Sequence, residues 1–407
     1  MLRKLAFVIV ALFSQASMAF DLDQGGHFQL TGFYNLTGAK LIGGGYDGMS
    51  SYNYVPVDGS SPTLQPQWRC PCTIQNWEYI GVYQYDKGWE ADVESLMGAQ
   101  FSASYDKHFS ATAQMVARAS DGTRPDYVPT LDWAYATWKP NEEWTIQAGQ
   151  KRIPLYYYSD YLYIGYSYPW VRPAPDVYGW PIYAYQGANV QYQKYIGDSD
   201  WVITSNVWYG NKTNRDDAYD TLIYYGTPTN HTWADMIGDW TTIGNGIFEV
   251  RAMMMGYKES MWQDNADGSH AQIDHKQFTR IKGADFNVDW KGLVVKSEAD
   301  QYTQNVNAPD RFVYDYYLAG IGYQFWQLLP MITSSHYVVE SYDYGGVPAP
   351  TEARSTRYFS LRWDFMKNTA LKVQYDLSRD HSEYYQYYGL PFLGDSKLFS
   401  ISLQGVF

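Results

Sequence analysis

Apolar and polar side chains alternate along many stretches of this chain, and this period restricts the possible fold more than any other feature. Residues 359–365 read FSLRWDF, so four apolar side chains share one face and Ser360, Arg362 and Asp364 share the other. Because successive side chains of a strand point to opposite faces, such a stretch predicts a strand between an apolar and a polar environment. A soluble sheet core rarely accepts these charges, whereas a water-filled lumen does.

Sixteen stretches of about ten residues show this pattern, with clear cases at 109–117, 284–290 and 371–377. They predict an all-β protein, a 16-stranded antiparallel transmembrane β-barrel. The alternation is blurred near 240–244 and 331–339. A pair of soluble β-sandwiches and a β-helix are the alternatives, and the lack of a fixed repeat period disfavours the β-helix.

The composition is also typical of strands that cross a membrane. No apolar run after Phe13 approaches the roughly 20 residues that a membrane helix needs. The chain holds 41 Tyr, 16 Trp and 17 Phe, together 18% of its residues. Amphipathic rings concentrate at both membrane interfaces, where barrels carry aromatic girdles, so this aromatic content favours the barrel.

The expected connections between strands alternate in length. The short ones are 105–108, 140–143, 197–200, 289–292 and 366–369. The long ones are 39–94, 119–129, 153–184, 211–236, 262–279, 303–311, 343–353 and 380–394. Short turns at one end and long loops at the other are the outer-membrane pattern, with the short end periplasmic. An even strand count then places both termini in the periplasm.

Both ends of the chain suggest export to an outer membrane. Arg3 and Lys4 precede an apolar run at 5–13 and a small-residue cleavage site at 17–19, which predicts a cleaved signal peptide over 1–19. An uncleaved anchor is the alternative. The barrel domain would then span 20–407. The last strand alternates up to a terminal aromatic, Phe407, and so resembles the strand that bacterial outer-membrane barrels present to the barrel-assembly machinery.

The net charge of −13, which becomes −15 without Arg3 and Lys4, argues against nucleic acid as a partner. Acidic loops also suit an outer leaflet of lipopolysaccharide, where divalent cations bridge the headgroups. We therefore expect outer-membrane lipid and lipopolysaccharide as partners.

Two cysteines, Cys70 and Cys72, flank Pro71. Two thiolates are half of a zinc site, and no histidine lies within about twenty residues of them. An exported location favours oxidation. We therefore expect a local disulfide that staples a surface loop, with metal binding and redox chemistry as the weaker alternatives. No metal site and no cofactor are expected.

The third long connection stands out, because it is rich in Tyr, Pro and Gly and too apolar to lie free in water. Its characteristic stretches are 151–154, 158–161 and 168–173. Here the chain resembles the Gram-negative outer-membrane porin superfamily, and the strand layout extends the resemblance over nearly all of 20–407. The resemblance implies a third loop that folds into the barrel and narrows the pore, and a homotrimer.

This loop gives the candidate constriction residues, which are Lys151, Arg152, Tyr158, Asp160, Tyr161, Tyr163, Trp170, Arg172 and Asp176. Charged residues on the polar faces of the predicted strands should line the lumen: Arg118, Arg251, Asp285, Lys296, Arg362, Asp364 and Lys372, with Glu249, Glu298 and Asp376. Rings of charge determine which ions enter a pore. Any one of these charges could equally be a solvated lumen residue away from the constriction.

The expected function is therefore passive diffusion of small hydrophilic solutes and ions across the outer membrane of a Gram-negative bacterium. A substrate-specific channel with a Tyr-rich constriction, for a sugar or an organic anion, is one alternative. A surface adhesin or receptor barrel is another. The seven histidines are scattered, so no catalytic residue is expected and an enzyme is disfavoured.

Overall fold

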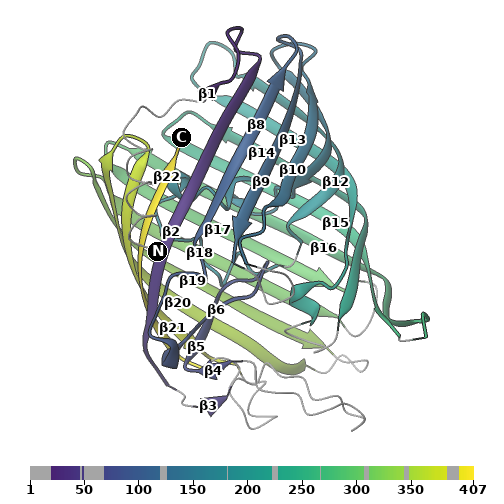
Figure 1. Cartoon of the computed structure of the whole chain (residues 1–407), viewed down its shortest axis with the longest axis vertical. Coiled ribbons are helices and arrows are strands. Elements are labelled where there is room, and N and C mark those ends of the chain that lie inside the picture. The colour runs from purple at the N-terminus through teal and green to yellow at the C-terminus, as the bar shows by residue number, and fades with distance from the viewer. Residues whose placement is uncertain are drawn as a thin grey trace.

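The computed structural model describes residues 20–45, 48–49, 68–119, 126–180, 182–221, 228–265, 267–306, 311–342, 348–382 and 394–407. One antiparallel sheet closes on itself as a barrel (Figure 1). Its sixteen long strands are β2 (Phe28–Gly44), β8 (Leu96–Ser104), β9 (Phe109–Arg118), β10 (Thr130–Trp138), β11 (Trp144–Arg152), β12 (Ala184–Tyr195), β13 (Val202–Asn214), β14 (Thr229–Gly244), β15 (Phe248–Asp264), β16 (His270–Trp290), β17 (Leu293–Gln304), β18 (Phe312–Tyr323), β19 (Leu328–Tyr342), β20 (Pro348–Met366), β21 (Thr369–Asp380) and β22 (Ser396–Val406). The predicted sixteen-stranded barrel is confirmed.

Short elements accompany these strands. The two-residue strands β1 (Phe20–Asp21) and β7 (Trp89–Glu90) join the barrel sheet through β2. Within the first long connection, β3 (Gly48–Met49) pairs with β4 (Arg69–Cys70), and β5 (Cys72–Asn76) pairs with β6 (Gly81–Gln84). A 3₁₀ turn, η1 (Tyr85–Lys87), follows β6.

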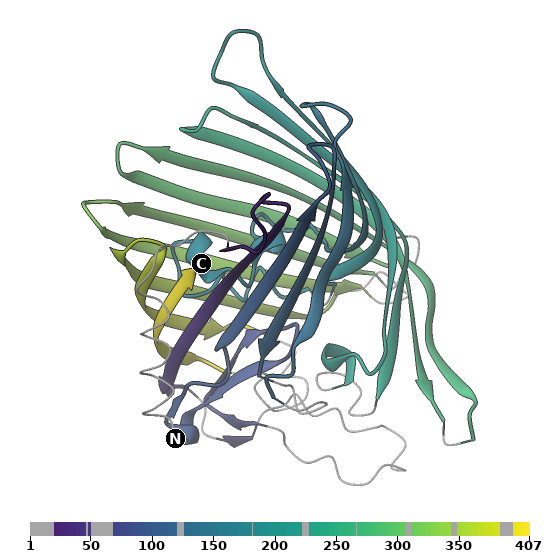
Figure 2. The same cartoon turned by 45° about the horizontal axis from the view of Figure 1, so that its top comes forward.

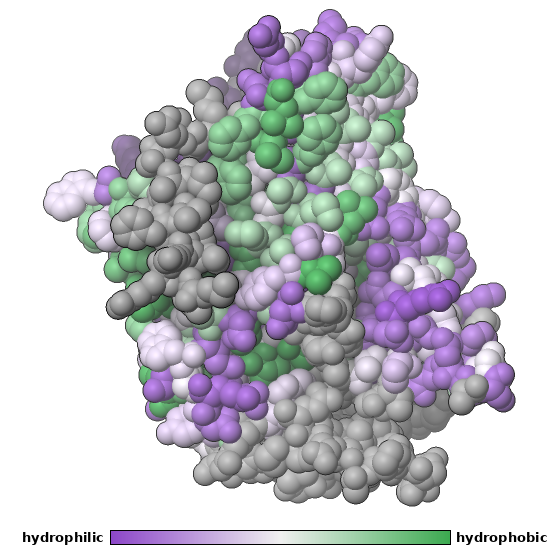
Figure 3. Space-filling model, in the orientation of Figure 1, coloured by the Kyte–Doolittle hydropathy of each residue, from purple (hydrophilic) through white to green (hydrophobic). Residues whose placement is uncertain are grey.

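The two faces of each strand meet different surroundings, as the alternation predicted. On β15, Val250 and Met254 are 52% and 54% exposed on the outside, whereas the residues that follow each of them, Arg251 and Met255, are 5% and 1% exposed. Figure 3 shows the resulting apolar surface over the upper and central part of one face, with hydrophilic residues at the rim. No helix in the described ranges is long and apolar enough to span a membrane.

The two blurred stretches lie within β14 and β19. In β14, the adjacent Thr241 and Thr242 put polar residues on both faces within 240–244, and a bulge lies just before this stretch, where the pairing with β15 shifts between Ala234 and Ile237. A bulge inserts an extra residue and so breaks the period of two. In β19, Ser334 is exposed while Thr333 and Ser335 are buried. Polar residues on both faces hide the alternation there.

The predicted connection over 262–279 is mostly strand, and that boundary was wrong. β15 and β16 continue beyond the barrel as a long hairpin, paired as far as Asp264 with His270, and this hairpin projects at the lower right of Figure 2. It carries many charged and polar residues, among them Asp264, Asp267 and His270, so its sequence resembles a solvated loop. The connection predicted over 211–236 is shortened in the same way, because β13 reaches Asn214 and β14 begins at Thr229.

The C-terminus closes the barrel. β22 pairs with β2, and Phe407 exchanges two main-chain hydrogen bonds with Gly32, at 2.9 and 2.7 Å. A Cβ atom on Gly32 would lie 2.3 Å from the Phe407 ring, so only glycine leaves room for the ring there. The role of Phe407 as an assembly signal stays a prediction, and the expected signal peptide lies outside the described residues.

Candidate functional site

The connection between β11 and β12 folds into the barrel, as predicted. It contains two 3₁₀ turns, η2 (Ser159–Tyr161) and η3 (Gly165–Ser167). Its rings form one buried cluster with wall residues of β13 to β20, which include Trp208, Trp233, Tyr257 and Tyr302. Because burying apolar area is worth about 25 cal/mol per Å², the aromatic loop is more stable inside this lumen than in water.

Hydrogen bonds attach this third connection to the opposite wall. The Trp170 indole Nε1 donates to Thr333 Oγ1 on β19 at 2.8 Å, and the Trp180 Nε1 donates to the Tyr257 hydroxyl on β15 at 2.9 Å. The Tyr178 hydroxyl donates to Glu298 Oε2 on β17 at 2.7 Å. The chain therefore crosses the whole lumen rather than lining its near side.

Arg172 is the main charged anchor of this connection. Its Nε and Nη2 donate to the two carboxylate oxygens of Glu94, both at 2.5 Å, and Nη1 donates to Asp376 Oδ2 at 2.9 Å. Nη2 also donates to Ser400 Oγ at 2.7 Å. Nearby, Asp176 accepts from Ser335 Oγ at 2.6 Å. Arg172 thus joins the first and third connections to β21 and β22.

Cations of the wall bind main-chain carbonyls of the third connection. Lys372 Nζ donates to the carbonyl oxygens of Gly165, Tyr168 and Trp170, at 2.7, 2.5 and 2.8 Å. Arg362 Nη1 donates to the Tyr168 carbonyl at 3.1 Å, and the same guanidinium pairs with Asp364 at 2.8 Å. These lysine and arginine side chains point into the barrel, and their hydrogen bonds go to the third connection.

Arg251 makes the same kind of contact at the start of the connection. Its Nη2 donates to the Pro154 carbonyl at 2.6 Å, and its Nη1 lies 3.2 Å from Asp285 Oδ2. A guanidinium that bridges a carboxylate and a carbonyl fixes the position of the loop strongly, because charged hydrogen bonds are stronger than neutral ones.

Besides Asp376, the acidic partners of the loop arginines are Glu78, Glu94 and Asp132, which the sequence did not single out. Arg152 donates to Glu78 Oε2 and to Asp132 Oδ1, both at 3.1 Å, and the Tyr163 hydroxyl donates to Glu78. Burial works to raise the pKa of Glu78, but the Arg152 and Arg118 cations outweigh it and lower that pKa below its ordinary value. Glu78 is therefore ionised at neutral pH.

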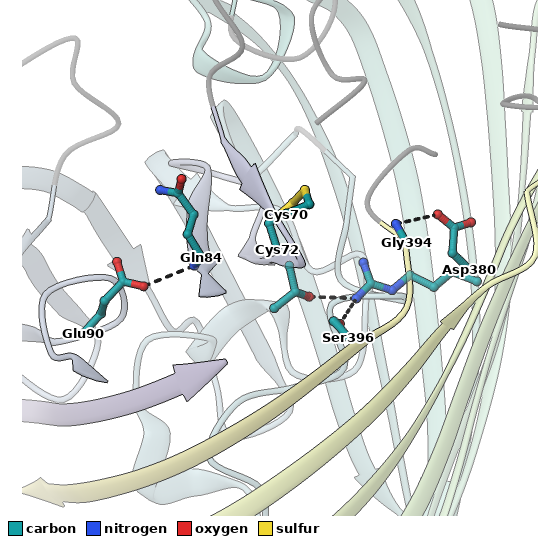
Figure 4. Close-up of a disulfide and its surroundings, with 9 residues drawn as sticks. Cys70, Cys72, Gln84, Glu90, Asp380, Gly394 and Ser396 are labelled. Atoms are coloured by element: carbon teal, nitrogen blue, oxygen red, sulfur yellow. Dashed lines mark hydrogen bonds between the residues drawn. A yellow bond between two sulfur atoms is a disulfide. The ribbon is translucent and has the colours of Figure 1, made fainter. Parts of the chain in front are cut away.

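The first connection packs against the third. The Trp77 Nε1 donates to the Pro175 carbonyl at 3.1 Å, and Arg354 on β20 donates to Thr73 Oγ1 at 2.7 Å. Cys70 and Cys72 form a disulfide in this segment and are 1% and 0% exposed (Figure 4). The expectation of a surface staple is wrong, because the pair lies in a buried cluster with Trp68, Ile74, Trp77 and Val82.

Replacing Cys70 and Cys72 by serine should loosen the first connection without unfolding the barrel. Two hydroxyls would enter an apolar cluster, at a cost of roughly 1–3 kcal/mol each where they lack a partner. We expect faster proteolysis within residues 68–95 and an unchanged heat-dependent shift in electrophoretic mobility. Equal proteolysis of the variant and the parent would contradict this role.

Among the charges at the lumen, Lys151, Asp160, Glu249 and Lys296 take part in no ion pair of the described residues. All four are partly exposed, as are Tyr157 and Tyr161. Lys151 Nζ donates to Asn189 Oδ1 at 3.2 Å, and Lys296 Nζ lies 5.9 Å from the centre of the Tyr157 ring. Burial raises the pKa of Asp160, partly countered by Lys151 and Arg251. We call these four charges, with Tyr157 and Tyr161, the polar strip.

The other predicted constriction residues are buried or paired. Tyr158, Tyr163 and Trp170 are at most 5% exposed, and Arg152, Arg172 and Asp176 also have at most 5% exposure. Arg118 lies over the Tyr79 and Tyr163 rings, 4.7 and 5.8 Å from their centres. Within the described ranges, no three His, Cys, Asp or Glu side chains converge on a metal position.

The sequence matches no protein-family model and no curated protein in the comparisons made. Solved structures match over nearly the whole chain. An OmpT variant of Vibrio cholerae that lacks loop L8 superposes with a TM-score of 0.53 at 10% identity, covering 94% of this chain and 100% of that one. The outer membrane channel DcaP of Acinetobacter baumannii gives 0.51 at 12% identity, with coverage of 93% and 97%. An anion-selective porin from Comamonas acidovorans gives 0.51 at 8% identity, with coverage of 93% and 99%. This chain therefore has a porin-like outer-membrane barrel fold.

Proposed function

We propose that the protein is an outer-membrane channel for passive diffusion of small hydrophilic solutes and ions. The polar strip carries this proposal, because its charges are partly exposed and free of ion pairs while the other loop charges are neutralised. The water path would run along the polar strip, between the third connection and the lumen faces of β11, β15 and β17.

The same geometry favours simple diffusion over an aromatic slide for sugars. Most rings of the third connection are packed in the buried cluster, and among its described residues Tyr157, Tyr161, Tyr166 and Tyr183 are partly exposed. A catalytic role has no support from this arrangement, so we propose that the protein is not an enzyme. The proposal also includes outer-membrane location in a Gram-negative bacterium and cleavage of a signal peptide after residue 19. It further includes assembly through Phe407, contact with lipopolysaccharide and a homotrimer. The solved porin-like barrels, one of them an OmpT trimer form, support the trimer by analogy.

Ion selectivity tests this function. Lys151→Gln with Lys296→Gln should shift the reversal potential in a salt gradient toward cation selectivity, because two unpaired positive charges leave the proposed path. Asp160→Asn with Glu249→Gln should shift it toward anions. Single-channel recording in planar bilayers makes the measurement.

The exposed pair Lys258 and Asp235, 2.8 Å apart on the outside of the barrel, provides the control. Lys258→Gln with Asp235→Asn should leave the selectivity unchanged. A parent protein without ohmic conductance would refute the channel. If the parent protein conducts but neither double variant changes its ion selectivity, the conducting path does not run along the polar strip.

A further inference from the structure

A cavity of about 270 Å³ lies at the long-loop end of the barrel, where β12 starts later than its neighbours. β12 begins at Ala184, and its last pairing with β13 at this end joins Gln186 to Asn211. Residues 212–214 of β13 continue beyond that point and pair only with β14 in the described sheet. The cavity occupies the space that a longer β12 would fill.

The lining brings charges of both signs together. Glu78 from the first connection, Arg118 from β9 and Asp132 from β10 are part of the lining. Lys212 and residues 213–219, which include Arg215, Asp216 and Asp217, also line it, and Tyr163 and Tyr183 of the third connection complete the lining. These groups come from five separate segments, so the site exists only in the folded barrel.

Several buried polar atoms at this cavity have no hydrogen-bond partner among the described residues. Asp132 Oδ1 accepts from Arg152, but Asp132 Oδ2 is unpartnered, and the side chain is only 9% exposed. The Arg118 Nε and the Tyr183 hydroxyl are unpartnered as well. A buried polar group without a partner costs about 1–3 kcal/mol, so these atoms favour an occupant that bonds to them.

A lysine of the lining also lacks an ion pair with the described residues. Lys212 is partly exposed, and no ion pair within 4.0 Å involves it in the part of the chain that the structure describes. Among the described residues, the cavity lining therefore includes an ammonium without an ion pair and a carboxylate oxygen without a hydrogen-bond partner. An occupant that carries one negative and one positive group would satisfy both, which a sugar or a simple anion would not.

We propose that this cavity binds a zwitterionic solute of amino-acid to dipeptide size. Its ammonium would meet the Asp132 carboxylate, and its carboxylate would meet the Lys212 ammonium. A water molecule takes about 30 Å³, so the cavity has the volume of roughly nine waters, enough for such a solute. The inference goes beyond the proposed channel, because binding here does not require conductance.

Titration calorimetry on the purified, detergent-solubilised full chain tests the site with alanyl-alanine as the probe. N-acetyl-alanyl-alanine lacks the ammonium, alanyl-alanine amide lacks the carboxylate, and glucose lacks both charges. We expect saturable binding of alanyl-alanine, at least tenfold weaker binding of each blocked dipeptide, and no binding of glucose.

Two variants test separately which residue binds the ammonium and which binds the carboxylate of the solute. Asp132→Asn should remove the preference for alanyl-alanine over its acetylated form, and Lys212→Gln should remove the preference over the amide. Asp235→Asn with Lys258→Gln, an exposed pair, should bind like the parent, and heat-dependent electrophoretic mobility checks the fold of every variant. Lys212 is partly exposed, so its variant tests the site even where Asp132→Asn fails to fold. Absence of saturable binding, equal binding of glucose, or unchanged preferences in both variants would overturn the proposal.

Discussion

Replacing residues 156–180 by a short glycine-serine linker is expected to raise the single-channel conductance severalfold. These residues cross the lumen and contact β15, β17, β19 and β21, so their removal clears most of the cross-section that they fill. Arg152 and Ala184 are paired across β11 and β12, so a short linker can join the two strands. Planar-bilayer recording measures the change, and heat-dependent electrophoretic mobility checks that the barrel is still closed.

The β15–β16 hairpin provides the matched control, because it projects beyond the barrel. Removing residues 262–272 shortens a hairpin whose pairs include Trp262 with Gln272. This deletion should leave the conductance close to that of the parent. An equal response to the two deletions, or no response to the first, would mean that the third connection is not the constriction.

Arg172→Met is expected to release the third connection from the wall. The change leaves Glu94 and Asp376 buried without the cation between them, and breaking a buried pair in this way costs about 3–5 kcal/mol. Because that energy holds a loop and not the sheet, the barrel should persist. We expect fluctuating, larger conductance steps and faster proteolytic cleavage within 153–183.

A compensating variant separates lost charge balance from lost packing. Adding Glu94→Gln and Asp376→Asn to Arg172→Met removes the unpaired charges, so conductance and protease resistance should return part of the way to the parent values. Lys194→Met is the control, since Lys194 and Glu143 are a surface pair 3.3 Å apart with 55% and 42% side-chain exposure. Such pairs contribute only about 0–1 kcal/mol. Parent-like behaviour of Arg172→Met would show that packing alone holds the loop.

Neutralising Lys151, Arg152 and Arg172 together would mix two effects. Arg152 and Arg172 are in buried ion pairs, so removing them would change the loop position as well as the charge of the pore. Lys151 alone is an unpaired lumen charge. The lumen pairs described above avoid this confusion, because each of their members is partly exposed and outside the ion pairs of the described residues.

The sequence by itself determined the strands, their number and the burial of the third connection. Each of these depends on local information: a period of two along β9, β15 or β20, and the apolar composition of 153–180. Bulges in β14 and polar residues on both faces beyond the membrane, as in the β15–β16 hairpin, blurred the boundaries. The assignment of residues to the two faces of each strand stayed correct, because one face meets lipid and the other does not.

Only the tertiary structure decided which charges are free and which are paired. Arg152 meets Glu78 across 74 positions of sequence, and Arg172 meets Asp376 across 204. The burial of Cys70 and Cys72 also depends on where the first connection lies over the third. Such pairings depend on strand register and barrel closure, which bring distant segments together at one height in the lumen. A local pattern carries no information about that height, so the sequence named the charged residues but not the polar strip.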